Sequence, residues 1–300
     1  MSSSDTPLVS VVTPSFNKGR FIEETIRSVL SQDYPRIEYI IIDGGSTDGT
    51  RAILEKYSRK IAFVSEPDKG QSDAINKGWR LAKGDILAYL NADDTYTPGA
   101  VRAAVESFSK NPDAGLVYGD GILTDESGRV ISTHSAGEFS LRDLLYCRDN
   151  ILQPAVFIRR AVYDRIGGID EELPLAMDLD YWIRTGLLFP AVYTRQPLAT
   201  AKIYAEAKSA ALMHQYVSDY DHILAKVFAD PNLPPGLAHE KNAIYTYVYT
   251  KGALDYLHLG MVREGLSMLW KAFWLNPSRC IADTFILIGQ SGLRKLRRSV

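Results

Sequence analysis

Short apolar runs alternate with amphipathic stretches between residues 8 and about 120. Four of these runs have the length and composition of buried strands: 8–12, 39–42, 61–64 and 86–90. Between them, apolar residues recur at helical spacing in 21–30, in 51–57 and around Ile75 and Trp79. Asn17 is expected to cap the first helix, and Ser46 or Thr47 the second. The pattern predicts βα units around a largely parallel sheet.

The order of elements changes after residue 115. A hairpin is expected over 116–124 and 129–133, turning on 125–128, because strand-like runs flank a turn-forming segment. Helical segments are predicted at 140–147, 160–166 and 178–187, and beyond residue 210 the pattern is purely helical, at 213–227, 243–259 and 262–275. We expect an α/β domain over about residues 1–210 and a helical region over 211–300.

Polar clusters follow the predicted strands directly. They occupy 13–15, 43–46, 66–68 and 91–94. Sheets of this class bind ligands at the carboxyl ends of their strands. The four clusters therefore predict one crevice.

Asp93 and Asp94 are the sharpest local signal, since adjacent carboxylates repel each other and are seldom placed at a strand end without a cation. Mg²⁺ or Mn²⁺ would suit the pair, because magnesium takes one or two protein carboxylates and completes its shell with phosphate oxygens and water. A solvated turn, or a cap for the helix after Pro98, is the alternative reading.

Composition narrows the class of protein. The formal net charge is -2, with 34 Lys and Arg against 36 Asp and Glu, so the basic surface that nucleic acids require is not indicated. Cys147 and Cys280 form no metal-binding or disulfide pattern. The N-terminus is short and polar, and no window reaches the roughly 18 apolar residues of a spanning helix. We expect a cytoplasmic protein.

Residues 8–200 resemble family 2 glycosyltransferases of the GT-A fold. The resemblance is carried by stretches that occur in the family's order and spacing: 11–17 (VVTPSFN), 42–50 (IDGGSTDGT), 66–78 (EPDKGQSDAINKG), 84–94 (GDILAYLNADD), 153–157 (QPAVF) and 177–184 (MDLDYWIR). Together they are far more specific than any one of them. The resemblance implies a GT-A catalytic fold and transfer of a sugar from a nucleotide-diphosphate donor.

The resemblance also implies roles for individual residues. Those expected to contact the nucleotide sugar are Thr13, Pro14, Asp43, Asp68, Asp73, Asn76 and Asp93. Asp94 is expected to be the direct metal ligand, with Asp93 assisting. Two alternatives stay open: Asp43 would cap the following turn, and Asp73 would form an ion pair with Lys77, four residues along a helix.

Asp178 matches the family's catalytic base, which takes the proton of the acceptor hydroxyl. Its alternative role is helix capping, since Asp is a common N-cap. Asp180 is expected to be structural. Gln153, Pro154 and Trp182 are assigned to the acceptor side, although a Pro ahead of a buried strand has a plain structural explanation.

The sequence departs from the family pattern near residue 202. Many relatives carry an Arg and, two residues later, a His that joins the metal, whereas this chain has Lys202 and Tyr204. Tyrosine is a poor magnesium ligand at neutral pH, so no protein ligand is assigned there. Lys202 and Lys208 are expected to contact the diphosphate instead.

The C-terminal region resembles a tetratricopeptide-type helical pair weakly, at Tyr249, Ala253, Tyr256, Gly265, Leu269, Ala272 and Pro277. One such repeat cannot bury its own apolar face, so it should pack on other helices or on a partner. Four basic residues close the chain, at Arg294, Lys295, Arg297 and Arg298. They would favour peripheral contact with an anionic membrane, or form a solvated terminus.

The resemblance, with the residues that carry it, implies an inverting, metal-assisted hexosyltransferase. The expected donor is a UDP- or GDP-sugar, the acceptor is a glycan, lipid-linked or other hydroxyl, and the setting is the biosynthesis of a cell-surface polysaccharide or glycan. A sugar nucleotidyltransferase would need a Gly-rich basic loop after the first strand, which 13–17 is not. The alternative from another class is a catalytically decayed domain that binds or scaffolds through its helical tail.

Overall fold

The structure is a computed structural model that describes residues 6–148, 151–204 and 216–298. The chain divides into two compact units. The first comprises Met1–Phe139, Asn150–Glu172 and Asp180–Ala207, and the second comprises Ser140–Asp149, Leu173–Leu179 and Lys208–Val300. Each unit is described separately below.

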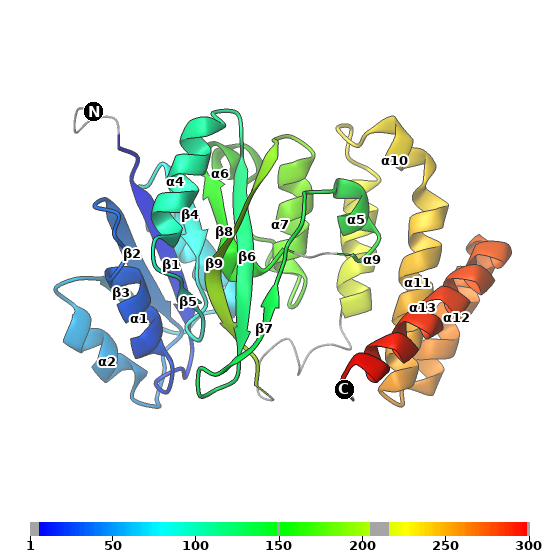
Figure 1. The fold of residues 1–300 in the computed structure, drawn as a ribbon, viewed down its shortest axis with the longest axis horizontal. Helices are drawn as coiled ribbons and strands as arrows, with labels where there is room; N and C mark the ends of the chain where they lie inside the picture. The colour runs from blue at the N-terminus through cyan, green and yellow to red at the C-terminus, as the bar shows by residue number, and fades with distance from the viewer. Residues whose placement is uncertain (1–5, 149–150, 205–215, 299–300) are drawn as a thin grey trace. The chain divides into compact units, whose positions relative to one another are not determined.

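The first unit contains a nine-stranded sheet among its described residues (Figure 1). Its strands are β1 (Val9–Ser15), β2 (Ile37–Asp43), β3 (Ala62–Ser65), β4 (Ile86–Tyr89), β5 (Thr95–Tyr96), β6 (Leu116–Thr124), β7 (Val130–His134), β8 (Val156–Arg159) and β9 (Ala191–Lys202). Their order is β3-β2-β1-β4-β8-β6-β9-β5, and β7 pairs with β6 as the predicted hairpin.

Most neighbouring strands in the site-forming half run parallel. β2 pairs in parallel with both β1 and β3, and β1 pairs in parallel with β4. β8 is antiparallel to β4 and to β6, whereas β6 and β9 are parallel. The expected α/β fold with a largely parallel sheet is confirmed.

Helices α1 (Ile22–Leu30), α2 (Thr50–Tyr57) and α3 (Gln71–Leu81) connect the parallel strands, and α4 (Ala100–Lys110) precedes β6. The two predicted caps are wrong. α1 begins after Phe21, and α2 begins after Gly49, whose φ of 93° favours glycine. Asn17 and Ser46 instead form hydrogen bonds within the loops that follow β1 and β2.

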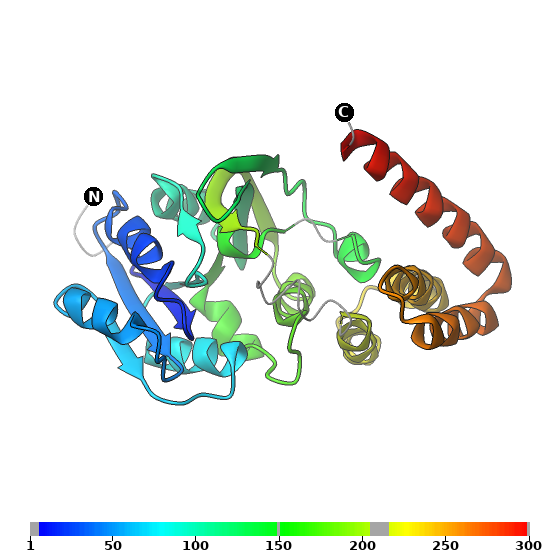
Figure 2. The ribbon, with the colours of Figure 1, turned by 90° about the horizontal axis from the view of Figure 1, so that it is seen from below.

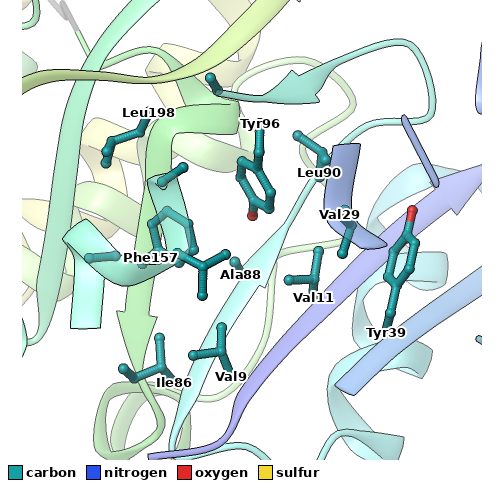
Figure 3. Packing of buried hydrophobic residues seen from close by; sticks show 14 of the residues in the cluster. Val9, Val11, Val29, Tyr39, Ile86, Ala88, Leu90, Tyr96, Phe157 and Leu198 are labelled. Atoms are coloured by element: carbon teal, nitrogen blue, oxygen red, sulfur yellow. The ribbon is translucent and has the colours of Figure 1, made fainter. Parts of the chain in front are cut away.

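The alternation of side chains along β1 fixes the two faces of the sheet. Val9 and Val11 pack into a core with apolar residues of α1 and α4 (Figure 3). Val12 faces the opposite side, where a Cβ on Gly78 of α3 would lie 2.3 Å from its Cγ1. Only glycine permits this approach. It brings α3 against the sheet, with the helix N-terminus next to the strand ends.

Two further elements of the first unit lie between β7 and β9: η1 (Gln153–Ala155) and α6 (Arg160–Ile166). Helix α7 (Met177–Gly186) begins in the second unit and ends in the first. The helices predicted at 160–166 and 178–187 are thus confirmed.

The second unit is helical. Its elements are α5 (Leu141–Leu145), α9 (Tyr216–Val227), α10 (Pro235–His239), α11 (Lys241–His258), α12 (Val262–Leu275) and α13 (Pro277–Arg298). A Cβ on Gly265 would lie 2.8 Å from Leu257 Cγ, so glycine allows α11 and α12 to pack side by side, as Figure 2 shows. The helical pair is confirmed, while its tetratricopeptide likeness stays a prediction.

No helix within the described ranges is both long enough and apolar enough to cross a membrane. Two sequence predictions fall outside what the structure describes. Lys208 lies among residues 205–215, and the side chains of the basic cluster at 294–298 are not described.

Candidate functional site

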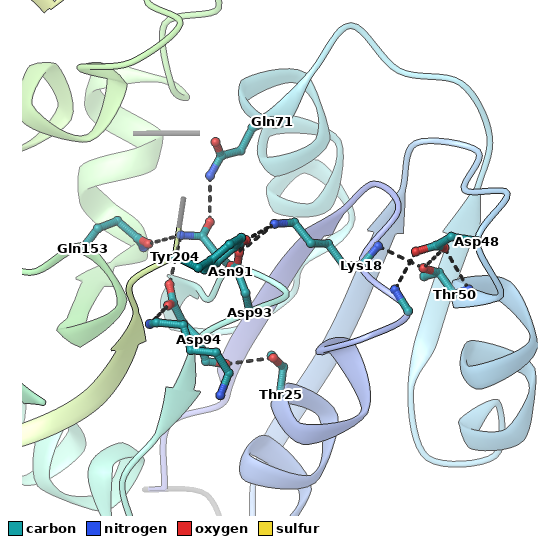
Figure 4. Close-up of polar contacts among 12 residues, drawn as sticks. Lys18, Thr25, Asp48, Thr50, Gln71, Asn91, Asp93, Asp94, Gln153 and Tyr204 are labelled. Atoms are coloured by element: carbon teal, nitrogen blue, oxygen red, sulfur yellow. Dashed lines mark hydrogen bonds and ion pairs between the residues drawn. The ribbon is translucent and has the colours of Figure 1, made fainter. Parts of the chain in front are cut away.

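The carboxyl ends of three parallel strands lie level in the first unit. Ser15 at the end of β1 pairs with Asp43 at the end of β2, which pairs with Ser65 at the end of β3. Asn91, Asp93 and Asp94 follow β4, which pairs with β1 on its other side. The sheet therefore gathers the predicted polar loops at one edge. Figure 4 shows the side chains of Asn91, Asp93 and Asp94 at the end of β4.

Asp94 is buried and held in place by hydrogen bonds within the fold. Its side chain is buried, Oδ1 accepts a hydrogen bond from the backbone N–H of Lys202 (3.2 Å), and Oδ2 accepts one from Asn91 Nδ2 (3.1 Å). Its backbone carbonyl accepts a hydrogen bond from Thr25 Oγ1 (2.8 Å). Burial, followed by the neighbouring charge of Asp93, raises the pKa of Asp94 to about 7. Negative charge at this point is costly unless a cation lies nearby.

Asp93 is the more exposed of the two acids, with 16% of its side chain exposed. Its Oδ2 accepts hydrogen bonds from Lys18 Nζ, at 2.7 Å, and from the Tyr204 hydroxyl. Lys18 Nζ also lies 2.5 Å from the Tyr204 hydroxyl oxygen. Burial by itself would lower the pKa of Lys18, but the hydrogen bond and charge of Asp93 raise it above its usual value. The cation beside the acid pair is therefore the Lys18 ammonium.

The loop after β1 fixes the backbone of Lys18. The Lys18 N–H donates to Thr50 Oγ1 (3.1 Å), and the Lys18 carbonyl accepts from the N–H groups of Phe21 and Ile22. Asn17 adopts a left-handed φ of 51°, and its Oδ1 accepts from the Thr47 N–H (2.9 Å). This loop is thus clamped to the loop after β2.

Lys18 is a residue of this candidate site that the sequence reasoning missed. A signal was available, because Lys18 is the first basic residue of the chain and follows the first strand within three residues. What the sequence could not show is the contact with Asp93, which lies 75 residues later.

Asn91 connects three segments at the end of β4. Its Oδ1 accepts a hydrogen bond from Gln71 Nε2 (2.7 Å), and its Nδ2 donates to Gln153 Oε1 (2.9 Å) as well as to Asp94. Gln153 Nε2 in turn donates to the Tyr89 carbonyl (2.9 Å). The structure thus brings Gln153 to the strand ends, while Pro154 is buried in η1.

Asp43 has the turn-capping role that was considered as its alternative. Both of its oxygens are used, since Oδ1 accepts from Ser46 Oγ (2.5 Å) and Oδ2 accepts from the Ser46 N–H (3.0 Å) and Ser65 Oγ (2.7 Å). Thr13 and Pro14 are buried within β1, where Thr13 Oγ1 lies 3.0 Å from the Tyr39 hydroxyl. Thr13, Pro14 and Asp43 thus lie at the ends of the neighbouring strands β1 and β2, at the edge of the site.

Asp68 and Asp73 flank Gly70, the turn into α3. Asp68 Oδ1 accepts from the Gly70 N–H (2.8 Å), and its Oδ2 lies so close to Gly44 that a Cβ there would be 2.7 Å away. Asp73 Oδ2 accepts from the Lys69 N–H (3.0 Å), which, with a smaller effect of Lys77 at 3.3 Å, lowers the pKa of Asp73. The ion pair with Lys77, the alternative role of Asp73, is present, and the contact of Asp73 with the nucleotide sugar stays a prediction.

Two predicted site residues, Asn76 and Trp182, are buried in packing contacts. Asn76 uses its amide in the α6–α7 connection, donating to the Ile169 carbonyl (2.9 Å) and accepting from the Ile169 N–H (2.8 Å). Trp182 is fully buried in α7, in an edge contact with Tyr181. Both lie on buried helix faces, next to the buried residues Ile75 and Ile183.

Lys202 has a different partner from the one expected. Its side chain is buried, and its Nζ lies 2.8 Å from Glu24 Oε2 on α1. Lys202 is the last residue of β9. Its backbone N–H donates to Asp94, while its ammonium pairs with Glu24 on α1. The expected contact of Lys202 with a diphosphate stays a prediction, since its ammonium pairs with Glu24 in this structure.

Asp178 is the second residue of α7, half-buried, and its Oδ1 accepts from the Leu179 N–H (2.8 Å). Asp180 is buried and lies 2.6 Å from Arg184 Nε, and Arg184 also donates to the carbonyls of Ile166 and Gly168. Asp180 thus has the structural role expected of it. Asp178 belongs to the second unit, whereas Asp93 belongs to the first.

The acid pair suits a metal ion that is held mainly by the oxygens of a bound phosphate compound and less by protein side chains. Nowhere in 6–148, 151–204 and 216–298 do three His, Cys, Asp or Glu side chains gather closely enough to hold a metal by themselves. Asp93 offers a partly exposed carboxylate, and burial next to it raises the pKa of Asp94. Such a pair fits a cation that takes its remaining ligands from phosphate and water.

Comparison with known proteins shows the family of this chain. The sequence profile described as "Glycosyl transferase family 2" matches residues 10–164. An uncharacterized glycosyltransferase of Mycobacterium tuberculosis is 35% identical over 192 residues, which are 63% of this chain and 72% of that protein.

Two solved structures share the fold at 18% identity. TarS from S. aureus, in complex with UDP-GlcNAc, has a TM-score of 0.70 over 92% of this chain and 83% of that one. The mannosyltransferase PcManGT from Pyrobaculum calidifontis, with GDP-Man and Mn²⁺, has a TM-score of 0.64 over 96% and 80%. The fold and site therefore define a glycosyltransferase with the GT-A fold. The chain belongs to glycosyl transferase family 2.

Proposed function

We propose that this chain transfers a sugar from a UDP- or GDP-activated donor to an acceptor hydroxyl, with inversion at the anomeric carbon and with assistance from Mg²⁺ or Mn²⁺. The observation that supports it most is the acid pair after β4, of which Asp94 is buried and Asp93 is accessible beside a cationic side chain. The donors named for TarS and PcManGT, and the Mn²⁺ of the latter, support this choice of donor and metal by analogy.

Asp93 is the carboxylate we assign to the metal. The sequence favoured Asp94, but Asp94 is buried and both of its oxygens accept hydrogen bonds from within the fold, whereas the Asp93 side chain is 16% exposed. A bound divalent cation would offset negative charge on the departing diphosphate. Asp94 then supports Asp93 by anchoring the loop between β4 and β5.

The nucleotide is proposed to lie along the loops after β1, β2 and β3. Thr13, Pro14 and Asp43 form the base of this surface, and Asp68 stands at its edge against Gly44. Asp73 holds the turn at the start of α3, where backbone N–H groups favour anions.

Asp178 is proposed as the general base that removes the acceptor proton, with Gln153 and Pro154 on the acceptor side. A single in-line displacement inverts the anomeric centre, and the proposal assigns no residue as a second nucleophile. Proton abstraction needs a carboxylate that is ionised at neutral pH and reachable by the acceptor, and Asp178 is half-buried, in contrast to Asp180.

The catalytic domain is proposed to span about residues 1–210, and the helical region 211–300 to contact an anionic membrane surface peripherally. Trp270 and Trp274 on α12 are 63% and 68% exposed, and Phe285 on α13 is 73% exposed. Tryptophan is enriched at membrane interfaces, and basic residues follow on the same stretch of sequence at 294–298. A surface of this composition suits membrane-bound acceptors for glycan assembly.

The direct test is thermal stabilisation by a panel of UDP- and GDP-sugars, with and without Mn²⁺, because a ligand that binds only the folded state raises the melting temperature. We expect one donor to stabilise the protein in a metal-dependent way, Asp93→Asn to lose this effect, and Asp113→Asn, an exposed control, to keep it. Stabilisation by no donor would contradict the proposal and favour a binding or scaffolding protein.

A further inference from the structure

Lys18 forms an ion pair at the point where the proposed metal would meet the protein. Its Nζ lies 2.7 Å from Asp93 Oδ2, and the two side chains are only 28% and 16% exposed. Partly buried pairs of this kind are screened much less than surface pairs. The ammonium and a divalent cation cannot both approach the same carboxylate oxygen closely, because like charges repel and the space is shared.

Aromatic rings surround the same ammonium. Lys18 Nζ lies 5.2 Å from the centre of the Tyr204 ring and 6.0 Å from that of Phe21, and the two rings are 5.2 Å apart. The Tyr204 hydroxyl donates to Asp93 and accepts from Lys18. The backbone of Lys18 is fixed by Thr50, so the side chain is directed into this position by the loop itself.

We infer that Lys18 is a built-in counter-cation that competes with the divalent metal for Asp93, and that it leaves Asp93 when a diphosphate offers its oxygens to the ammonium. In the free protein the pair lowers the affinity for metal. In the presence of a nucleoside diphosphate the released ammonium gains a new anionic partner, so that metal and diphosphate bind with positive coupling. This inference rests on the proposed function, because it takes Asp93 as the carboxylate that meets the metal.

The test is a Mn²⁺ titration of the full chain without nucleotide, in which free Mn²⁺ is followed by electron paramagnetic resonance. Lys18→Met removes the ammonium and retains most of the apolar stem, and we expect it to bind Mn²⁺ about tenfold more tightly than the wild type, a factor that corresponds to about 1.4 kcal/mol. Lys56→Met is the matched control, because Lys56 forms an ion pair with Glu23 on the surface. It should leave the affinity unchanged.

A second titration, with UDP or GDP present, measures the coupling. The gain in Mn²⁺ affinity on adding the diphosphate should be smaller in Lys18→Met than in the wild type, by about the same tenfold factor. Lys18→Gln, which keeps a polar side chain without the charge, should behave like Lys18→Met, and circular dichroism melting checks that each variant is folded.

The outcomes separate this inference from the proposed function. Equal or weaker Mn²⁺ binding by folded Lys18→Met or Lys18→Gln, or no detectable binding by either, would overturn the role of Lys18. If Asp93→Asn binds Mn²⁺ as tightly as the wild type, the assignment of Asp93 to the metal fails instead, whatever the lysine variants show.

Discussion

Oδ1 of Asp94 accepts a hydrogen bond from the backbone N–H of Lys202, 108 residues later in the chain. The bond joins the loop after β4 to the last residue of β9, and Asn91 completes the carboxylate's set of partners. The two acids therefore have different environments: Asp94 is buried and held within the fold, and Asp93, which we propose meets the metal, is partly exposed.

The first prediction concerns this difference. Asp94→Ala should lower the melting temperature by several degrees, because it leaves the buried Lys202 N–H without its acceptor, at a cost of about 1–3 kcal/mol. Asp93→Ala should cost less, since its side chain is partly exposed, while it abolishes metal-dependent donor binding. Thermal melting and titration calorimetry measure the two effects. Equal melting temperatures for the two variants would contradict this difference in environment.

Asp178→Asn tests the proposed base. Asparagine caps helices about as well as aspartate but cannot accept the proton, so transfer should fall by about 10²–10⁴-fold while donor affinity stays near the wild type. Asp143→Asn, in the first turn of α5, is the control and should keep its activity. Initial rates with the acceptor and donor calorimetry decide the matter. Full activity in Asp178→Asn would leave Asp178 with a capping role only.

Gly78→Ala should destabilise the protein, because the new methyl group would lie 2.3 Å from Val12 Cγ1, and overpacking of a core costs about 1–3 kcal/mol. Val12→Ala in the same chain should recover part of this loss, since it removes the clashing methyl groups. Urea unfolding of both single variants and the double variant measures the coupling. Strictly additive effects would show that the α3–β1 contact is looser than described.

Glu240 tests a pH dependence in the second unit. Hydrogen bonds from Arg142 and then from Tyr146 lower the pKa of Glu240. Because the folded pKa is depressed, the stabilisation is present above the ordinary value of 4.5 and is lost as the pH falls through the folded value. Glu240→Gln should melt lower than the wild type at pH 7 by up to about 2 °C, since such pairs contribute about 0.2–1 kcal/mol, and the difference should vanish in acid. A constant difference down to low pH would refute this origin.

Trp270 and Trp274 test the proposed membrane contact. Replacing both with Ala should reduce co-sedimentation with phosphatidylglycerol vesicles, because exposed tryptophan rings partition into the interface. Deleting residues 285–300 should reduce it further and leave donor hydrolysis unchanged. Phosphatidylcholine vesicles are the uncharged control. If the full chain binds neither kind of vesicle, the membrane contact is ruled out.

Much of the first unit could be predicted from the chain alone. The strands at 9–15, 37–43, 62–65 and 86–89, the hairpin after residue 115 and the helices between them follow from periodicity, because a buried face imposes its period on local sequence. The structure places Gln153 beside Asn91, while its assignment to the acceptor side stays a prediction.

The sequence by itself thus determined the order of elements, the GT-A fold class and the strand ends at which the acidic residues gather. Only the tertiary structure decided that Lys18 reaches Asp93, that the Lys202 ammonium is held by Glu24, and that Asn76 is committed to Ile169. These contacts join residues between 75 and 178 positions apart. Local periodicity reports which face of an element is buried, but a side chain's partner depends on how distant segments pack, and neither composition nor spacing encodes that distance.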